Sequence, residues 1–180
     1  MSRLEIKFCG FGGQGIATMG AIVGEAIALY ENKYTIMTQS YGPESRGGAS
    51  SADVVVDDDE IDFPLVTEPD YMILMSEEAY EKYVSSLKEG GILFVEKDLV
   101  KLDDKAKKAK KILEIPATEI AESLGSKIYA NIVMLGFFCA NSDVVSETAL
   151  INTIKRRIRQ KYIEKNLIAF EKGKNYNKEG

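Results

Sequence analysis

The sequence predicts an α/β fold in which helices cover both faces of an open, mostly parallel sheet. Strand-like apolar runs alternate with helical patterns along the chain, and the first run leads through a glycine-rich turn into an amphipathic helix. The length of 180 residues, with 45% hydrophobic and 28% charged side chains, suits one globular domain. We therefore expect a single domain over residues 1–180, with 173–180 as a tail polar enough to fray.

The first part of the chain predicts three strands and one helix. Residues 4–9 alternate apolar and polar side chains, which is typical of a strand. Between residues 13 and 31 apolar side chains recur every three or four positions, which predicts a helix. Residues 34–38 and 51–56 are rich in β-branched side chains and predict two further strands. The segment between these two strands has too many breakers for regular structure.

The rest of the chain continues the alternation and ends in helices. The run at 128–140 is apolar on all sides and shorter than the roughly 18 residues of a membrane span, so we expect a buried helix and no membrane span. The remaining predictions are strands at 71–75, 92–95 and 111–115, helices at 77–87 and 116–124, and a surface helix with the stripe Ile151, Ile154 and Ile158.

Composition excludes several classes of function. The chain has no histidine, which removes Ser-His-Asp and Cys-His nucleophiles and histidine-ligated metals. The net charge of -5 argues against general nucleic-acid binding. Cys9 and Cys139 lie in apolar surroundings, which predicts reduced thiols and a cytoplasmic location, and two cysteines are too few for an iron–sulfur cluster. Residues 1–6 do not resemble a secretory signal.

A glycine-rich turn follows the first predicted strand and precedes the first predicted helix. Its residues satisfy the spacing G-x-G-x-x-G, which makes the predicted fold Rossmann-like. Three interpretations remain open: a dinucleotide site, a purely structural turn, or a site for a phosphate, a carboxylate or a partner's cofactor. The acidic residue that grips a dinucleotide ribose is missing, because the second strand leads into Gln39 and Ser40. The candidate residues are Gly10, Gly12, Gly13, Gln14 and Gly15.

A second candidate loop follows the second predicted strand, at the sheet edge where α/β proteins bind ligands. Arg46 is suited to pair with a phosphate or carboxylate. The alternative is a salt-bridged loop in which Glu44 neutralises Arg46. The acidic run at 57–60 favours a solvated turn over a metal site. The candidate residues of this loop are Ser40, Tyr41, Gly42, Pro43, Glu44, Arg46, Gly47 and Gly48.

Together, the motifs at 9–16 and 39–48 resemble the gamma subunit or gamma domain of 2-oxoacid:ferredoxin oxidoreductases. The form Ser-Tyr-Gly-Pro-Glu-x-Arg-Gly-Gly in the second motif is most similar to that of the 2-oxoglutarate and branched-chain types. The resemblance implies a subunit of an enzyme that oxidatively decarboxylates a 2-oxoacid with coenzyme A to an acyl-CoA and passes electrons to ferredoxin or a similar acceptor.

The resemblance also implies a division of labour. Thiamine diphosphate, Mg and iron–sulfur clusters would belong to companion alpha, beta and delta subunits, and this chain would hold no catalytic residue, metal or cofactor alone. Its two loops would either contact coenzyme A or face only the partner subunits. The alternatives are a stand-alone nucleotide- or flavin-binding oxidoreductase domain and a noncatalytic scaffold.

Overall fold

A computed structural model describes residues 3–41 and 48–176, and its centre is one six-stranded sheet in the order β2-β3-β1-β4-β5-β6. Every strand expected from the sequence forms, with bounds that differ by two residues at most. The strands are β1 (Leu4–Phe11), β2 (Tyr34–Ser40), β3 (Ala49–Asp57), β4 (Tyr71–Leu74), β5 (Ile92–Glu96) and β6 (Lys111–Ile115).

The sheet is mostly parallel, as expected, with one reversed strand. β1 pairs in parallel with β4, β4 with β5, and β5 with β6. β3 lies between β1 and β2 and is antiparallel to both. The sequence analysis predicted β3 as a strand but did not predict its direction. The reversed direction fits the short connection between Ser40 and Ala49, because a crossover to a parallel strand would need a dozen or more residues.

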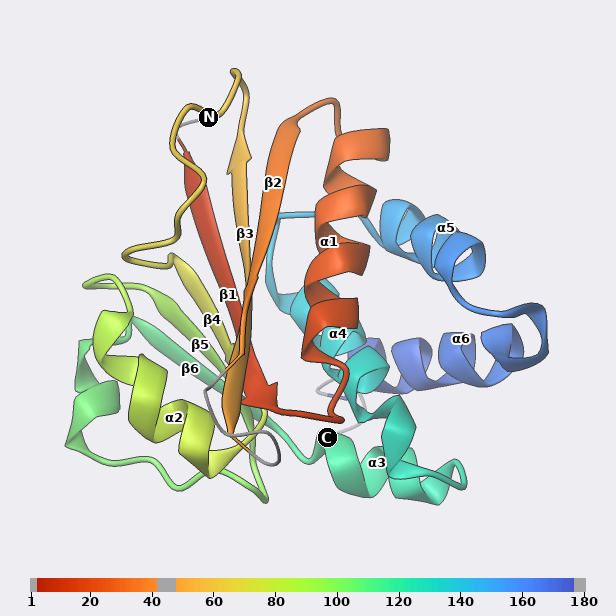
Figure 1. Ribbon diagram of the computed structural model, residues 1–180. Coiled ribbons are helices and arrows are strands. Elements are labelled where there is room, and N and C mark those ends of the chain that lie inside the picture. The colour runs from red at the N-terminus through yellow and green to blue at the C-terminus, as the bar shows by residue number, and fades with distance from the viewer. Residues whose placement is uncertain (1–2, 42–47, 177–180) are drawn as a thin grey trace.

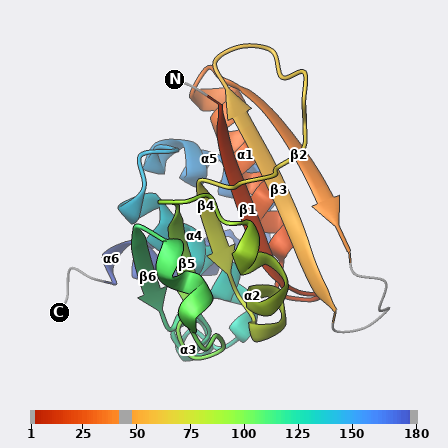
Figure 2. The same cartoon turned by 90° about the vertical axis from the view of Figure 1, so that its left-hand side faces the viewer.

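Helices cover both faces of the sheet, again as expected (Figures 1 and 2). Helix α2 lies on one face, and α1, α4, α5 and α6 form a layer on the other. The helices are α1 (Ile16–Tyr30), α2 (Glu77–Tyr83), α3 (Ala117–Ser123), α4 (Ala130–Asn141), α5 (Glu147–Arg157) and α6 (Gln160–Asn175), with short 3-10 helices η1 (Val84–Ser86), η2 (Asp104–Lys108) and η3 (Lys127–Tyr129).

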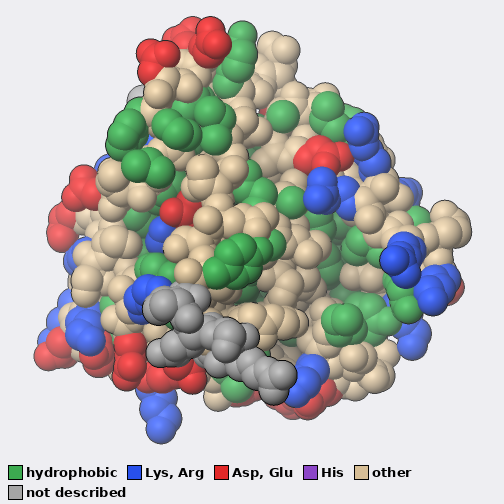
Figure 3. Space-filling model, in the orientation of Figure 1, with side chains coloured by type: hydrophobic (Ala, Val, Ile, Leu, Met, Phe, Trp, Pro, Cys, Tyr) green, Lys and Arg blue, Asp and Glu red, His purple; other side chains and the backbone are tan. Residues whose placement is uncertain are grey.

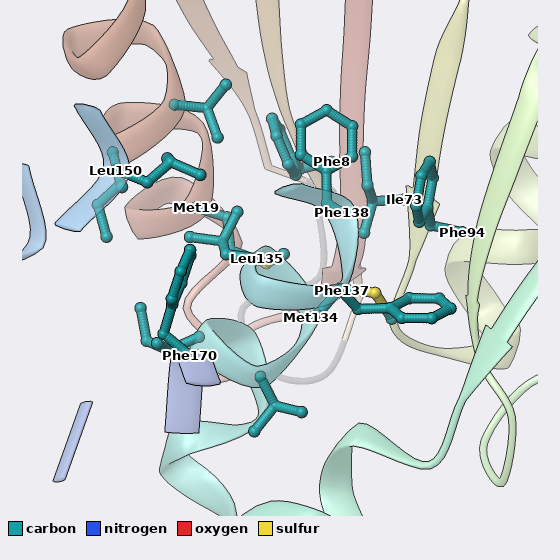
Figure 4. Close-up of a cluster of buried hydrophobic side chains, with 14 of the residues drawn as sticks. Phe8, Met19, Ile73, Phe94, Met134, Leu135, Phe137, Phe138, Leu150 and Phe170 are labelled. Carbon is teal, nitrogen blue, oxygen red and sulfur yellow. The ribbon is translucent and has the colours of Figure 1, made fainter. Parts of the chain in front are cut away.

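The larger core cluster lies between the sheet and the layer that contains α1 and α4. Phe94 of β5 and Phe138 of α4 meet edge to face with ring centroids 5.1 Å apart, and Phe8 of β1 approaches the same Phe138 ring (Figure 4). A second cluster fills the space beneath α2. α4 is buried along most of its length, as its all-round apolar sequence predicts. Among the described residues, no helix is long and apolar enough to cross a membrane.

The C-terminal region after α4 contains two helices, α5 and α6, where the sequence pattern predicted one surface helix. The chain leaves the helical conformation at Ile158, so α5 ends at Arg157 and α6 begins at Gln160. The stripe Ile151, Ile154 and Ile158 therefore continues one residue beyond its helix. Gly173 and Asn175 belong to α6, and residues 177–180 lie outside the described residues, so a frayed tail stays a prediction there.

Candidate functional site

The two candidate loops start from the same edge of the sheet. β1 and β2 run in the same direction, and β3 runs back between them. The last residues of β1 and β2 and the first residues of β3 therefore lie at the same edge. Phe11 at the end of β1 pairs with Ala49 at the start of β3, and Ser40 at the end of β2 pairs with Ser51. The Ser50 hydroxyl donates to the Gly10 carbonyl at 3.2 Å. The structure thus brings the flanks of both predicted loops together.

Gln14 holds the glycine turn in place. Its side-chain oxygen accepts from the Phe11 backbone N–H at 2.9 Å, and its side-chain nitrogen donates to the Met75 carbonyl at 2.7 Å. The Met75 N–H in turn donates to the Cys9 carbonyl at 2.9 Å. Because both ends of the amide are used inside the protein, Gln14 positions the turn and is not oriented toward a ligand.

The glycines of the turn have different physical reasons to be glycine. Gly13 and Gly15 have φ values of 99° and 74°, which disfavour residues with a side chain. A Cβ at Gly10 would lie 2.5 Å from Oε1 of Gln14, so this position is closed by packing. A Cβ at Gly12 would meet no atom within 4 Å, so its backbone faces open space. The open side of the turn is the side available to a ligand or partner.

A pocket of about 400 Å³ lies beside this turn, at the start of α1. Gly15 begins α1 without a side-chain cap, and no acidic residue occupies the first turn, so the positive end of the helix dipole is not offset locally. Asn131 and Asn166, each only 7% exposed, line the pocket together with apolar side chains. The lining residues are Gly13, Gly15, Thr18, Ile128, Tyr129, Asn131, Ile132, Ile158, Tyr162 and Asn166.

The sequence did not reveal this pocket, because its walls come from three distant segments. Asn131 stands inside an apolar run, and its side-chain oxygen accepts from the Ile132 N–H at 2.9 Å. Its side-chain nitrogen lies against Gly15, where any Cβ would clash with it. Asn166 donates to the Tyr162 carbonyl at 2.8 Å. A polar residue within an apolar helix pattern is the one sequence feature that could have indicated this pocket.

The second loop is described only at its ends. Tyr41 is 71% exposed, and its hydroxyl donates to the side-chain oxygen of Gln39 at 2.5 Å. Ser40 ends β2, and Gly48 precedes β3. The other candidates lie outside the described residues, so an anion contact by Arg46 stays a prediction. These candidates are Gly42, Pro43, Glu44, Arg46 and Gly47.

The strand order weakens the dinucleotide interpretation further. In the classical fold, β1 and β2 are neighbours, so an acidic residue at the end of β2 reaches the ribose of a dinucleotide on the glycine turn. Here β3 separates them, which places the end of β2 about 10 Å from β1 where adjacent strands lie about 5 Å apart. The missing acidic residue and this extra separation both argue against a dinucleotide site at the glycine turn.

The cysteines do not fit a shared iron–sulfur site. Cys9 belongs to the cluster beneath α2, whereas Cys139 packs against the cluster on the other face of the sheet. Burial raises the pKa of the Cys9 thiol, and it raises the pKa of Cys139 to about 11, so both thiols are protonated at neutral pH. Within residues 3–41 and 48–176, no three His, Cys, Asp or Glu side chains gather as metal ligands do.

An open, mostly parallel sheet with helices on both faces and two glycine-rich loops at one edge defines an α/β domain of Rossmann-like type. The sequence pattern of the pyruvate ferredoxin/flavodoxin oxidoreductase family matches residues 5–176, and the chain belongs to this family. The resemblance of its two glycine-rich motifs is thereby confirmed.

Relatives of the chain agree with this assignment. The 2-oxoglutarate synthase subunit KorC of Methanocaldococcus jannaschii is 46% identical over 95% of this chain and 92% of its own length. The gamma subunit of a keto/oxoacid ferredoxin oxidoreductase from Geobacter sulfurreducens has a solved structure that is 37% identical, with a TM-score of 0.86 over 97% of this chain and 96% of its own. The same fold occurs, at 22% identity and a TM-score of 0.86 over all of this chain, in 32% of a chain of 2-oxoglutarate:ferredoxin oxidoreductase from Magnetococcus marinus.

Proposed function

We propose that this chain is the gamma-type subunit of a 2-oxoglutarate:ferredoxin oxidoreductase, active only within a multi-subunit complex. The observation that carries the proposal is the 46% identity, along nearly the full length of both chains, to a 2-oxoglutarate synthase subunit. The complex would convert 2-oxoglutarate and coenzyme A to the acyl-CoA and CO2, and it would pass two electrons to ferredoxin or a similar acceptor.

The chemistry of decarboxylation and electron transfer belongs, in this proposal, to companion subunits. Alpha, beta and delta chains would carry thiamine diphosphate, Mg and the iron–sulfur clusters, because the two cysteines of this chain lie on opposite faces of its sheet and are too few to hold a cluster. The two free thiols support a reducing, cytoplasmic location. Residues 1–180 would act as one domain.

The role of this chain would lie at the edge that carries its two loops. The open backbone at Gly12, the uncapped start of α1 and the amides of Asn131 and Asn166 favour a polar or anionic group beside the glycine turn. A phosphate of coenzyme A has this chemistry, and an acidic or carbonyl-bearing segment of a companion subunit shares it. Tyr41, exposed at the same edge, would contact the bound partner.

The test compares the chain alone with the chain in its complex. Purified alone, it should be colourless and should not reduce methyl viologen with 2-oxoglutarate. Coexpressed with its companions, it should yield a complex whose methyl viologen reduction requires 2-oxoglutarate, coenzyme A and thiamine diphosphate. The matched control is the same complex prepared without this chain, which should lose most of its activity.

Two results would contradict the proposal in different ways. A tightly bound flavin or nicotinamide in the isolated chain would favour a stand-alone oxidoreductase domain. Full activity of the complex without this chain would favour a noncatalytic scaffold.

A further inference from the structure

The connection between β3 and β4, residues 58–70, presents apolar side chains to solvent; we call it the β3–β4 loop. It contains no helix or strand. Phe63 is 52% exposed and Leu65 is 53% exposed, and the partly exposed Ile61, Pro64 and Val66 lie next to them in the chain. Figure 3 shows hydrophobic side chains gathered at the upper left, over this loop. Apolar side chains that gather in a patch, unlike scattered ones, mark interaction sites.

Two charged side chains, Arg3 just before β1 and Glu5 within it, hold the backbone of this loop in one conformation. The Arg3 guanidinium donates to the carbonyl of Phe63 at 2.5 Å and to that of Leu65 at 2.7 Å. The Glu5 carboxylate accepts from the N–H groups of Thr67 at 2.7 Å and Glu68 at 3.0 Å, and it also pairs with Arg3 at 2.9 Å. The loop is therefore ordered by its backbone, without burying its apolar side chains.

This arrangement lowers the cost of binding a partner. The carbonyls and N–H groups of an irregular loop normally need water, but here four of them are satisfied within the protein. The Arg3 guanidinium also lies 5.6 Å from the centre of the Phe63 ring and fixes one side of it. A partner that buries Phe63 and Leu65 would gain apolar contact without having to order the loop.

The charge around the patch indicates the chemistry of that partner. Residues 57–60 are all acidic, and Asp62 lies between Ile61 and Phe63. In Figure 3, acidic side chains lie at the top, directly above the apolar patch. An apolar surface with an acidic rim is complementary to an apolar pocket with a basic rim. Two copies of this chain meeting through the same patch would place acidic rims against each other, which disfavours self-association.

We infer that the β3–β4 loop docks this chain onto a companion subunit of its complex by inserting Phe63 and Leu65 into an apolar pocket rimmed by Lys and Arg. The inference rests on the proposed function for the existence of a companion subunit. It adds the surface that is used and the chemistry of the surface that receives it. The loop differs from the glycine-rich loops, which lie at the opposite ends of β1 and β3.

The test measures binding of the full-length chain to its companion subunits, purified together from cells that lack this chain. The double variant Phe63→Ser/Leu65→Ser should bind at least about tenfold more weakly, since two large apolar side chains would no longer be removed from water in the complex. It should keep its circular dichroism spectrum and melting temperature, because both side chains are already half exposed. The matched control is Leu29→Ser on α1, which is 49% exposed and lies outside the loop.

A second variant tests the rim. Asp59→Lys/Glu60→Lys should slow association severalfold at low salt and reduce its dependence on salt, since a complementary charge has been reversed. If the Phe63→Ser/Leu65→Ser variant binds as wild type does, or if Leu29→Ser weakens binding equally, the inference is wrong and the proposed function stands. If the wild-type chain binds no companion subunit, the proposed function fails and the inference fails with it. Weakening of self-association alone would also overturn the inference.

Discussion

At the scale of single residues, the glycines of the turn separate into structural and exposed positions. Gly10 is enclosed by the side chains of Gln14 and Ile16, whereas the space beside Gly12 is open. All glycines of a G-x-G-x-x-G motif look equivalent in the sequence. Their surroundings show which one contributes to the fold and which one faces outward.

This difference makes Gly12 and Gly10 a matched pair of probes. Gly12→Ala should leave the melting temperature within about 2 °C of wild type, because a surface change is usually within ±0.5 kcal/mol. It should weaken coenzyme A use or assembly of the complex. Gly10→Ala should cost about 1–3 kcal/mol, since its methyl group would overlap Ile16. Thermal unfolding and subunit binding of both variants provide the measurement, and a stable, fully functional Gly10→Ala would contradict the assignment.

A second prediction concerns Glu96, which is fully buried at the end of β5. Its carboxylate accepts from the Thr118 N–H at 2.8 Å, the Thr118 hydroxyl at 2.9 Å and the Asp98 N–H at 3.2 Å. Burial raises the pKa of Glu96, although these hydrogen bonds oppose the shift. The folded state therefore binds more protons than the unfolded state at pH values between the ordinary glutamate pKa of about 4.3 and the raised one.

As pH rises through this window, the contribution of Glu96 to the free energy of unfolding should decrease. Glu96→Gln removes the titration and keeps one acceptor oxygen. The free energy of unfolding of wild type minus that of Glu96→Gln should thus fall from pH 4 upward, as urea denaturation at several pH values would measure. A difference that stays constant or grows with pH would contradict the raised pKa.

At the scale of elements, α4 and α6 pack with their backbones unusually close. A Cβ added to Gly136 of α4 would overlap the Phe170 carbonyl, and one added to Gly173 of α6 would overlap the Val133 carbonyl. Glycine inside a helix normally costs about 1 kcal/mol relative to alanine. Here close packing outweighs that cost, because backbone on both helices occupies the space a side chain would take.

Gly136→Ala should therefore destabilise the protein by about 3 kcal/mol or more, despite the higher helix propensity of alanine. Gly24→Ala on α1 is the matched control, since a Cβ there would meet its nearest side chain at an ordinary 3.7 Å. That variant should be neutral or stabilising. Chemical denaturation measures the free energy of unfolding of both variants. Equal effects of the two substitutions would contradict the prediction, because they would show that α4 and α6 can move apart at little cost.

The sequence analysis did not predict the break between α5 and α6. Residues 147–175 contain no proline and no glycine before Gly173, so nothing local ends a helix at Arg157. The turn is required by packing, because α6 must reverse to lie along α4. Apolar periodicity predicted that this region is helical. The position of the break could not be predicted, because it depends on contacts with residues distant in the sequence.

At the scale of the whole molecule, alternation of strand and helix predicted the fold class and the common edge of the two loops. Strand direction was not predictable at β3, because the apolar pattern of a buried strand is the same in either direction. The pocket beside α1 was not predictable for a related reason: Gly15, Asn131 and Asn166 meet only after three segments have packed. Local patterns determine elements, while sites assembled from distant segments require the tertiary structure.

The reversed strand β3 also limits what protein engineering can achieve on this scaffold. Introducing an acidic residue at position 40 would copy the ribose contact of nicotinamide-dependent enzymes in sequence only, since that residue would sit one strand spacing, about 5 Å, too far from the turn. Conversion into a nicotinamide-dependent enzyme would require β2 to pair directly with β1. That change would displace β3 from between them and replace the pairing of all three strands.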